Sequence, residues 1–284
     1  MAATRPANRA ATSADQADLC ETFRALHVPG RPFVLANAHD IGSAKMLTGL
    51  GAQAIGTTSA GYAFTLGQPD GARVSRDEML DHCEDMAKAV AVPVSADLEN
   101  GYADDPDGVA DCVALAVEVG LAGCSIEDST FDRRAPAYDL EVAVARIEAA
   151  VGAAEAAGFP FTLCARADGV MTGAYDLEEA IRRIQAFEEV GAHCVYVPMP
   201  GSMADQARVC ASVGVPVNAL AVGPLAQHPL AAFAKAGAAR ISVGSAIARV
   251  THRMVHDVGK AVLGGDFSGL KLGMPGAKVD AFLR

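Results

Sequence analysis

The sequence predicts an α/β fold in which eight parallel strands close into a (β/α)8 barrel of the TIM type. Three observations support this prediction. Short β-rich runs recur along the chain, with helical stretches rich in Ala, Glu and Leu between them. These runs are apolar on both faces, as expected for strands buried in a parallel sheet. Glycine precedes several of them, at the point where a helix must end.

The expected strands follow one another in chain order. We place them at residues 33–40, 54–61, 92–99, 123–129, 161–168, 194–200, 215–221 and 240–246. Helix ends that carry glycine fall at residues 49–53, 118–123, 189–193 and 235–240. A helix–glycine–strand unit that repeats in this way is typical of a closed barrel. The alternative, an open doubly wound sheet, would have fewer strands and a glycine-rich phosphate turn after the first, where residues 37–40 read Asn-Ala-His-Asp.

Length and composition fit one large domain. The 284 residues, of which 51% are hydrophobic, suffice for a single barrel domain over residues 1–284. Residues 1–18 are rich in Ala and Thr and lack an apolar segment, so we expect a flexible tail rather than a secretory signal. No long uninterrupted apolar run occurs, so we expect no membrane-spanning helix.

Charge and cysteine content bear on partners and compartment. The formal net charge of −11 argues against binding to nucleic acid or to an anionic membrane surface, because both favour a basic face. An anionic small molecule stays possible, since a metal ion and one or two arginines can reverse the charge locally. The seven cysteines show no metal-binding spacing, and several lie in apolar runs, which predicts reduced thiols and a cytoplasmic location.

Polar residues gather at the carboxyl ends of the expected strands. In a barrel these ends converge on one rim, where active sites form. Buried polar groups are costly unless they are partnered, so this clustering indicates a binding site. The residues concerned are Asn37, His39, Asp40, Ser59, Asp97, Glu99, Glu127, Asp128, Arg166, Asp168 and Asn218.

Three acids at this rim predict a metal site. Asp97 and Glu99 stand two apart on one expected strand, so both should point to the same side, and Glu127 lies on the next strand. Crowded carboxylates repel each other, and a divalent cation offsets the repulsion; an all-oxygen set suits Mg²⁺ or Mn²⁺. The competing interpretation is that the acids pair with basic side chains. Arg166 could brace them and also grip a substrate carboxylate with two donors.

Two weaker signals accompany this set. Ser59, with the backbone of Ala60 and Gly61, follows the second strand in a turn that can donate N–H groups to an anion. His39 stands at the rim beside Asp40, although a lone histidine beside a strand is more often packed than catalytic.

Four ordered motifs resemble the isocitrate lyase/phosphoenolpyruvate mutase superfamily. They are TTSAGYAFTLGQPDG (57–71), VPVSADLENGYADDP (92–106), GCSIEDSTF (123–131) and LCARAD (163–168). The resemblance covers roughly residues 20–265. It implies a barrel whose last helix is exchanged with a neighbouring subunit, here within about residues 245–284, and assembly as a dimer of dimers. It also implies Mg²⁺, a small α-keto or α-hydroxy carboxylate substrate and an enolate-like species.

The resemblance assigns roles to individual residues. The metal-site acids would be Asp97, Glu99, Glu127 and, in an outer shell through water, Asp70. The substrate-binding residues would be Ser59, Ala60, Gly61, Arg166 and Asn218. The superfamily most often has Asp where this chain has Glu99, and the additional methylene would shift the metal or favour contact through water.

The loop over residues 129–140 departs from both specialised branches of the superfamily. The isocitrate and methylisocitrate lyases carry a Lys-(Lys/Arg)-Cys-Gly-His segment there, and this loop contains neither cysteine nor histidine. The phosphonopyruvate mutases and hydrolases carry two lysines and an asparagine, which correspond to Ser129, Arg133 and the region of Ala135. What is left is common to all members: a metal, a carboxylate grip and a site for an enolate.

These features favour an Mg²⁺-dependent lyase or decarboxylase that cleaves a carbon–carbon bond of an oxaloacetate-like or malate-like acid. Arg166 and the metal would stabilise the enolate charge. The candidates for proton transfer are Tyr62, Arg133, Tyr138 and His39. One alternative is a phosphorus–carbon bond mutase or hydrolase that acts on a phosphonopyruvate-like substrate. Another is a metal-binding barrel without turnover.

Overall fold

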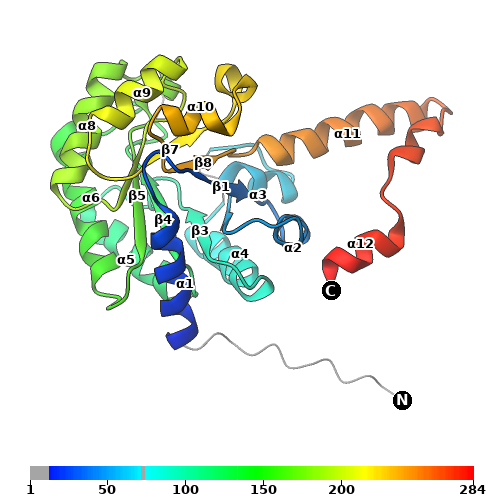
Figure 1. Cartoon of the computed structure of the whole chain (residues 1–284), viewed down its shortest axis with the longest axis horizontal. Helices are drawn as coiled ribbons and strands as arrows, with labels where there is room; N and C mark the ends of the chain where they lie inside the picture. The colour runs from blue at the N-terminus through cyan, green and yellow to red at the C-terminus, as the bar shows by residue number, and fades with distance from the viewer. Residues whose placement is uncertain (1–12, 72–73, 133) are drawn as a thin grey trace.

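Eight parallel strands close into one barrel, in the order in which they occur along the chain (Figure 1). The structure is a computed structural model and describes residues 13–71, 74–132 and 134–284. The strands are β1 (Phe33–Asn37), β2 (Ile55–Gly56), β3 (Val94–Asp97), β4 (Gly123–Glu127), β5 (Thr162–Arg166), β6 (Cys194–Tyr196), β7 (Val217–Leu220) and β8 (Arg240–Ser242). Each lies within its expected range, so the predicted (β/α)8 barrel is confirmed. All eight end before the expected boundary, because the chain bends there into the loops of the rim.

Helices connect the strands and surround the barrel (Figure 1). In the first half of the chain they are α1 (Ser13–Leu26), α2 (Ile41–Gly49), α3 (Ser59–Thr65), α4 (Arg76–Ala89), α5 (Pro106–Glu118) and α6 (Leu140–Glu155). In the second half they are α7 (Gly169–Thr172), α8 (Leu177–Glu189), α9 (Met203–Ala211), α10 (Leu230–Lys235), α11 (Ala246–Leu263) and α12 (Gly276–Leu283). Two short 3-10 segments complete the set, η1 (Gly223–Gln227) and η2 (Ser268–Leu272).

The expectation of a flexible tail over residues 1–18 is wrong for residues 13–18, which belong to α1. This helix is held to the barrel: Gln16 Nε2 donates to the carbonyl oxygens of Val117 at 2.7 Å and Leu121 at 3.0 Å. Cys20 and Phe23 of α1 are fully buried. Burial of these side chains offsets the entropy lost by ordering the segment. Residues 1–12 lie outside the described residues.

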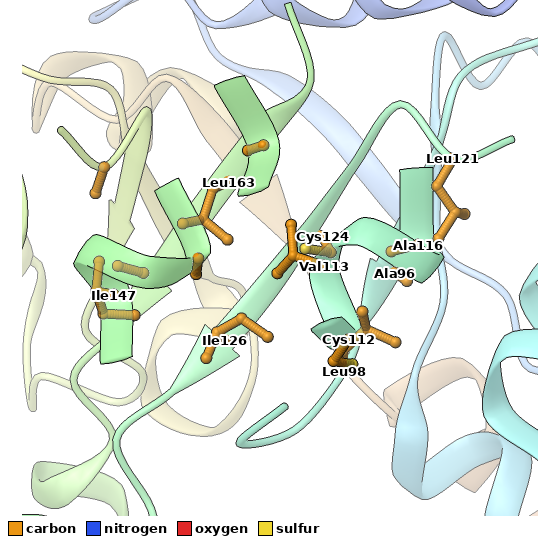
Figure 2. Packing of buried hydrophobic residues seen from close by; sticks show 14 of the residues in the cluster. Ala96, Leu98, Cys112, Val113, Ala116, Leu121, Cys124, Ile126, Ile147 and Leu163 are labelled. Carbon is orange, nitrogen blue, oxygen red and sulfur yellow. The ribbon is translucent and has the colours of Figure 1, made fainter. Parts of the chain in front are cut away.

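The main hydrophobic core lies between the strands and the helices that cover them. Figure 2 shows one sector, in which Val113 and Ala116 of α5 pack over Cys124 and Ile126 of β4. Because the strands also face a barrel interior, both of their faces are largely buried, with Val34 of β1 an exposed exception. This burial explains the continuous apolar runs of the sequence. The cysteines Cys20, Cys83, Cys112, Cys124, Cys164, Cys194 and Cys210 are all free.

The segment after β8 leaves the barrel. Figure 1 shows α11 projecting away from the strands and α12 returning toward α2. There the Lys45 Nζ donates to the Leu283 carbonyl oxygen at 2.8 Å, and Phe282 packs over Gly49. Large apolar side chains on and after α11 are exposed, among them Val255 at 72% and Leu263 at 92%. Over the described ranges, no helix combines the length and apolarity needed to cross a bilayer.

Candidate active site

A cavity of about 990 Å³ opens at the carboxyl ends of the strands. Loops from around the barrel contribute to its lining, as expected for the rim on which barrel enzymes place their sites. Its charged floor comprises Asp97, Glu99, Glu127, Arg166 and Asp168, which we call the acidic centre. The acidic centre is formed where β3, β4 and β5 end beside one another.

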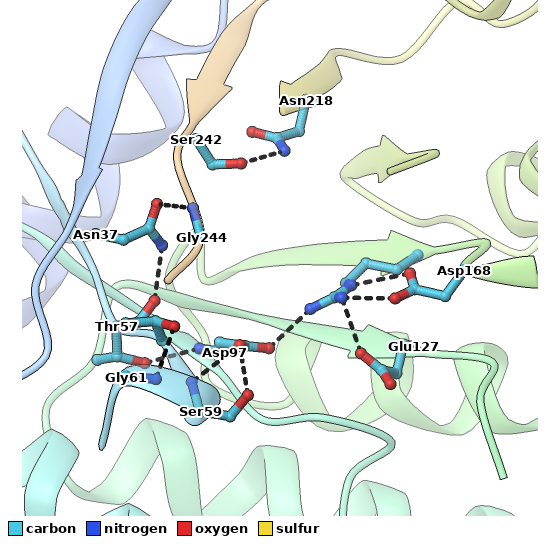
Figure 3. Close-up of polar contacts among 12 residues, drawn as sticks. Asn37, Thr57, Ser59, Gly61, Asp97, Glu127, Asp168, Asn218, Ser242 and Gly244 are labelled. Carbon is cyan, nitrogen blue, oxygen red and sulfur yellow. Dashed lines mark hydrogen bonds and ion pairs between the residues drawn. The ribbon is translucent and has the colours of Figure 1, made fainter. Parts of the chain in front are cut away.

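Arg166 pairs with three of the four carboxylates of the acidic centre. Its Nη1 lies 2.8 Å from Asp97 Oδ1, and its Nη2 lies 2.9 Å from Glu127 Oε2 (Figure 3). Asp168 receives two bonds from the same guanidinium, at 3.1 Å from Nε and 2.6 Å from Nη2. The strand register explains the closeness, because Glu127 and Arg166 are direct partners across β4 and β5. The side chain of Arg166 is only 12% exposed, so the guanidinium is fixed as well as neutralised.

Asp97 also connects the acidic centre to the start of α3. Its Oδ2 accepts from the Ser59 backbone N at 3.0 Å and from Ser59 Oγ at 2.8 Å (Figure 3). Thr58 caps α3 by accepting from the Gly61 N at 3.2 Å. The turn after β2 therefore donates to a protein carboxylate, and Ser59 and Ala60 line the cavity while Gly61 does not.

Glu99 reaches the cavity by a different route from the one expected. The expectation that Asp97 and Glu99 share a strand is wrong, because β3 ends at Asp97. Glu99 has a positive φ of 50°, which turns the chain, and its backbone oxygen accepts from the Glu127 N at 2.9 Å. The backbone conformation, not strand alternation, brings this carboxylate to the acidic centre. A non-glycine residue in this region is strained, and such strain is concentrated at functional sites.

Burial and the closeness of other carboxylates raise the pKa of two acids in the cavity. Burial raises the pKa of Glu127 well above its usual value; Arg166 opposes this, and the carboxylates of Asp168, Asp97 and Glu99 add to it. Asp70, at the edge of the cavity, has a raised pKa because of burial and the nearby charge of Asp97. One arginine thus leaves the centre rich in negative charge, and a bound cation would relieve it.

Three acids of this centre, Asp97, Glu127 and Asp168, are paired with Arg166. In the part of the chain that the structure describes, no three His, Cys, Asp or Glu side chains already surround a common point in the manner of a metal site. The competing interpretation of the sequence, pairing with a basic side chain, therefore describes the geometry observed. The donor set still fits a hard divalent cation, because it consists of carboxylate oxygens crowded on one cavity floor.

Several expected site residues lie elsewhere. Tyr62 points out of α3 and stacks on His82 of α4, with ring centroids 3.9 Å apart, and is not part of the cavity lining. His39 is also absent from the lining and packs against the start of α3, where a Cβ on Gly61 would lie 2.9 Å from its Cβ. Tyr138 donates to Asp104 at 2.5 Å, away from the cavity. Arg133 lies outside the described residues.

Other members of the lining were missed or left without a role. The sequence places Asp168 at the rim, but only the structure shows that it accepts two hydrogen bonds from Arg166. The Arg-Ala-Asp spacing at 166–168 is the sequence signal that could have indicated this pair. Tyr196 lies beneath the Arg166 guanidinium, 5.3 Å from ring centroid to Cζ. Arg240, at the start of β8, donates to Asn218 Oδ1 at 2.8 Å. Asn218 does line the cavity as expected, and it is fully buried.

A second layer of polar contacts holds the loop that follows β4. Asp128 accepts from the Asp168 backbone N at 2.8 Å, from the Tyr175 hydroxyl at 2.6 Å and from Arg183 Nη1 at 2.9 Å. Arg183 also donates to the Tyr138 carbonyl oxygen at 2.8 Å. Asp128 therefore ties together the ends of β4 and β5, and Arg183 ties the end of the 129–140 loop to them.

Comparison with known proteins identifies the family. Residues 23–263 match the family model described as "Phosphoenolpyruvate phosphomutase". The chain belongs to the phosphoenolpyruvate phosphomutase family. The resemblance expected from the motifs is thereby confirmed, and a 2,3-dimethylmalate lyase described as a PEP mutase/isocitrate lyase superfamily member has the same fold, with a TM-score of 0.80, 26% identity and coverage of 94% of this chain and 95% of that one.

Two similar proteins have names that give no precise activity. An uncharacterized protein of Mycobacterium tuberculosis is 35% identical over 225 residues, 79% of this chain and 82% of the relative. A Burkholderia cenocepacia J2315 structure, described only as a candidate lyase/mutase, has a TM-score of 0.90 and 40% identity over 95% of this chain and 96% of that chain.

More distant members are named for lyase and decarboxylase activities. The 2,3-dimethylmalate lyase of Eubacterium barkeri is 28% identical over 205 residues, 70% of this chain and 67% of the relative. An oxaloacetate decarboxylase of Marinomonas sp. is 26% identical over 215 residues, 72% of each chain. A phosphonopyruvate hydrolase in complex with oxalate and Mg²⁺ shares the fold, with a TM-score of 0.82 and 23% identity over 93% of this chain and 94% of that one.

Proposed function

We propose that this protein is an Mg²⁺-dependent lyase or decarboxylase that cleaves a carbon–carbon bond of a small α-keto or α-hydroxy carboxylic acid through an enolate. The observation that carries the proposal is Arg166, a guanidinium fixed by three carboxylates on the floor of a cavity at the strand ends. The superfamily contains lyases, decarboxylases and phosphonate enzymes, and relatives named for the first two activities favour carbon–carbon chemistry.

The residues of the acidic centre have distinct parts in this proposal. Asp97, Glu99 and Glu127 would hold the ion, with Asp70 farther out. When bound, Mg²⁺ supplies a Lewis acid that stabilises the negative charge of an enolate. Arg166 would donate to the substrate carboxylate, and Asp168 would keep its guanidinium in one orientation. Ser59 would hold Asp97 in place through its two hydrogen bonds.

The experiment is a product assay on the purified protein. With Mg²⁺ present, a panel of oxaloacetate-like and substituted malate-like acids should give a 2-oxo acid such as pyruvate, detected by a coupled dehydrogenase. Absence of such a product from every acid in the panel would rule the proposal out. A complex with Mg²⁺ and oxalate, a flat mimic of an enolate, would test the assignment of Asp97, Glu99 and Glu127.

The second candidate is a phosphorus–carbon bond mutase or hydrolase, which the description of the matching family model favours. Phosphorus NMR of phosphonopyruvate incubated with the protein separates the two. A new phosphoenolpyruvate or phosphate signal would support this candidate, and an unchanged spectrum would exclude it.

We also propose that the protein assembles as a dimer of dimers, with helices of residues 245–284 exchanged between subunits. The exposed apolar side chains of this segment support the proposal, because Val255 and Leu263 gain from being covered. Light scattering should give a tetramer mass, and Val255→Glu should reduce it. The free cysteines are in keeping with a reducing compartment, so we propose a cytoplasmic location.

A further inference from the structure

One side of the cavity is apolar. Its lining includes the side chains of Phe131, Pro136, Met171, Met199, Leu220 and Val222, which we call the apolar wall. The apolar wall is contributed by β7, by helix α7, which follows β5, and by the loops that follow β4, β6 and β7, so it continues around the rim from the acidic centre. The two surfaces belong to one cavity, and a single small molecule can contact both.

The largest side chains of the apolar wall are exposed. Phe131 is 39% exposed, Met171 45% and Met199 36%. A single exposed apolar side chain needs no explanation, but three gathered on the wall of one cavity mark a surface that binds something apolar. Methionine suits such a surface, because its flexible thioether adapts to ligands of different shape.

The backbone is strained in order to present two of these side chains. Phe131 has a φ of 61° and Met199 a φ of 54°, in the left-handed region that large side chains disfavour. The turn that carries Phe131 is closed by hydrogen bonds from the Thr130 N to the Pro136 oxygen at 3.3 Å and from the Asp132 N to Thr130 Oγ1 at 3.1 Å. Gly223 leaves room for Met199, since a Cβ there would lie 3.3 Å from its Cε. Strain retained at a cavity wall indicates a functional use.

The cavity is larger than a four-carbon acid needs. Its volume of about 990 Å³ lies at the upper end of the range of roughly 300–1,000 Å³ in which proteins enclose drug-sized ligands. An oxaloacetate- or malate-sized acid on the acidic centre would leave the apolar wall uncovered.

We infer that the substrate carries an alkyl or aryl substituent larger than methyl on carbon 3, and that the apolar wall binds this substituent. The inference rests on the proposed function and specifies its substrate class. In the lyase reaction the bond between carbons 2 and 3 breaks and the carbon 2 hydroxyl loses its proton. Carbon 2 becomes the carbonyl of a 2-oxo acid. The electron pair passes to carbon 3, which takes up a proton, so the substituent leaves in the carboxylic acid product and no oxidant is required.

Binding of inert analogues tests the inference without turnover. Benzylsuccinate and succinate lack the carbon 2 hydroxyl and cannot be cleaved. In calorimetric titrations with Mg²⁺ present, benzylsuccinate should bind the full-length protein at least tenfold more tightly than succinate, because each buried methylene group contributes about fourfold. Equal affinity for the two acids would overturn the inference.

Variants locate the source of the preference. Met171→Gln with Met199→Gln preserves side-chain length, and both positions are solvent-exposed, so the fold should persist. This double variant should lose most of the preference for benzylsuccinate while its affinity for oxalate stays unchanged. Leu230→Gln on α10, 47% exposed and outside the cavity, is the matched control and should behave as the wild type. A double variant that keeps the full preference would contradict the assignment of the apolar wall.

Cleavage assays with 3-benzylmalate and malate distinguish failure of this inference from failure of the proposed function. If 3-benzylmalate is cleaved with a kcat/KM at least tenfold above that of malate, both stand. If malate is the better substrate, the inference fails and the proposed function survives. If neither acid is cleaved but benzylsuccinate binds with the expected preference, the apolar wall stands and the proposed reaction fails.

Discussion

The acidic centre and the apolar wall share one cavity but are built in different ways. In the acidic centre Arg166 is bonded to Asp97, Glu127 and Asp168, and the strand register sets these contacts. The apolar wall is contributed largely by loops, with exposed side chains and two strained residues, Phe131 and Met199. Rigid strand ends suit a reaction centre whose charges must stay in place, whereas loops suit substrate selection, because they can change without disturbing the barrel.

Removal of divalent metal should have the largest effect, and it should act through the acidic centre alone. We expect chelation to abolish carbon–carbon cleavage, and Mg²⁺ or Mn²⁺ to restore it, because the crowded carboxylates need a cation both to hold the substrate and to stabilise the enolate. Initial rates during back-titration of the chelated protein measure this. Full activity in excess chelator would show that the acidic centre works without a metal.

Arg166→Lys should come next in size. We expect kcat/KM to fall by about 10²–10³-fold, since a lysine cannot reproduce the bonds to three carboxylates or the two-point grip on a substrate. The loss should be the same for substituted and unsubstituted acids, because Arg166 belongs to the acidic centre. Arg208→Lys on the exposed surface of α9, where Arg208 pairs with Glu178, is the control. A loss confined to substituted acids would break the distinction between the two surfaces.

Asp168→Asn should have a smaller effect of the same kind. The amide keeps the shape but removes the charge that holds Arg166 Nε and Nη2. We expect a roughly tenfold fall in kcat/KM and a loss of about 1–3 kcal/mol in the free energy of unfolding, measured by urea denaturation. Unchanged kinetics with lowered stability would show that Asp168 is only structural.

The smallest expected effect on activity comes from the pH dependence of stability. It arises at His82, which packs against α3, the helix whose first residue bonds to Asp97. Burial lowers the pKa of His82 to about 4; Asp40 and Asp85 raise it slightly, and His39 lowers it further. The unfolded chain, with a histidine pKa near 6.5, therefore binds more protons than the folded protein between these values, and stability falls as the pH drops. Between pH 7.5 and 5 the loss from His82 is about 2 kcal/mol.

The variant His82→Phe tests this, because it keeps a ring stacked on Tyr62 of α3 but cannot titrate. Its unfolding free energy should fall less than that of the wild type between the two pH values. An identical fall in both proteins would mean that His82 is not the group responsible.

The strands and the acidic rim were predictable from the sequence because both depend on local patterns. Residues buried on both faces form continuous apolar runs, and the polar residues that interrupt them mark the strand ends. Asp97, Glu127 and Arg166 stand at those interruptions, and the barrel brings them together whatever the details of the loops. The helix over residues 13–18 was harder to predict, because α1 is held by a side chain that contacts residues 117–121 only after folding.

The directions in which the side chains point could not be predicted from the sequence. His39 follows the end of β1 as closely as Ser59 follows the end of β2, yet it packs on α3. Tyr62, one turn farther along α3, stacks on α4. Glu99 reaches the cavity through a positive φ that no residue pattern announces. Such outcomes depend on which helix packs against each loop, and the packing partner is distant in sequence.

The barrel and the charge at its rim can be derived from the sequence alone, because periodic burial and strand-end polarity are properties of short segments. Tertiary structure is needed to pair Arg166 with Asp97, Glu127 and Asp168. It is also needed to bring Phe131, Met171 and Met199 to the lining of the same cavity. The ion pairs of Arg166 join the ends of β3, β4 and β5, and the three apolar side chains come from the segments that follow β4, β5 and β6. Their distances follow from how the closed barrel sets its strand ends, which no single segment encodes.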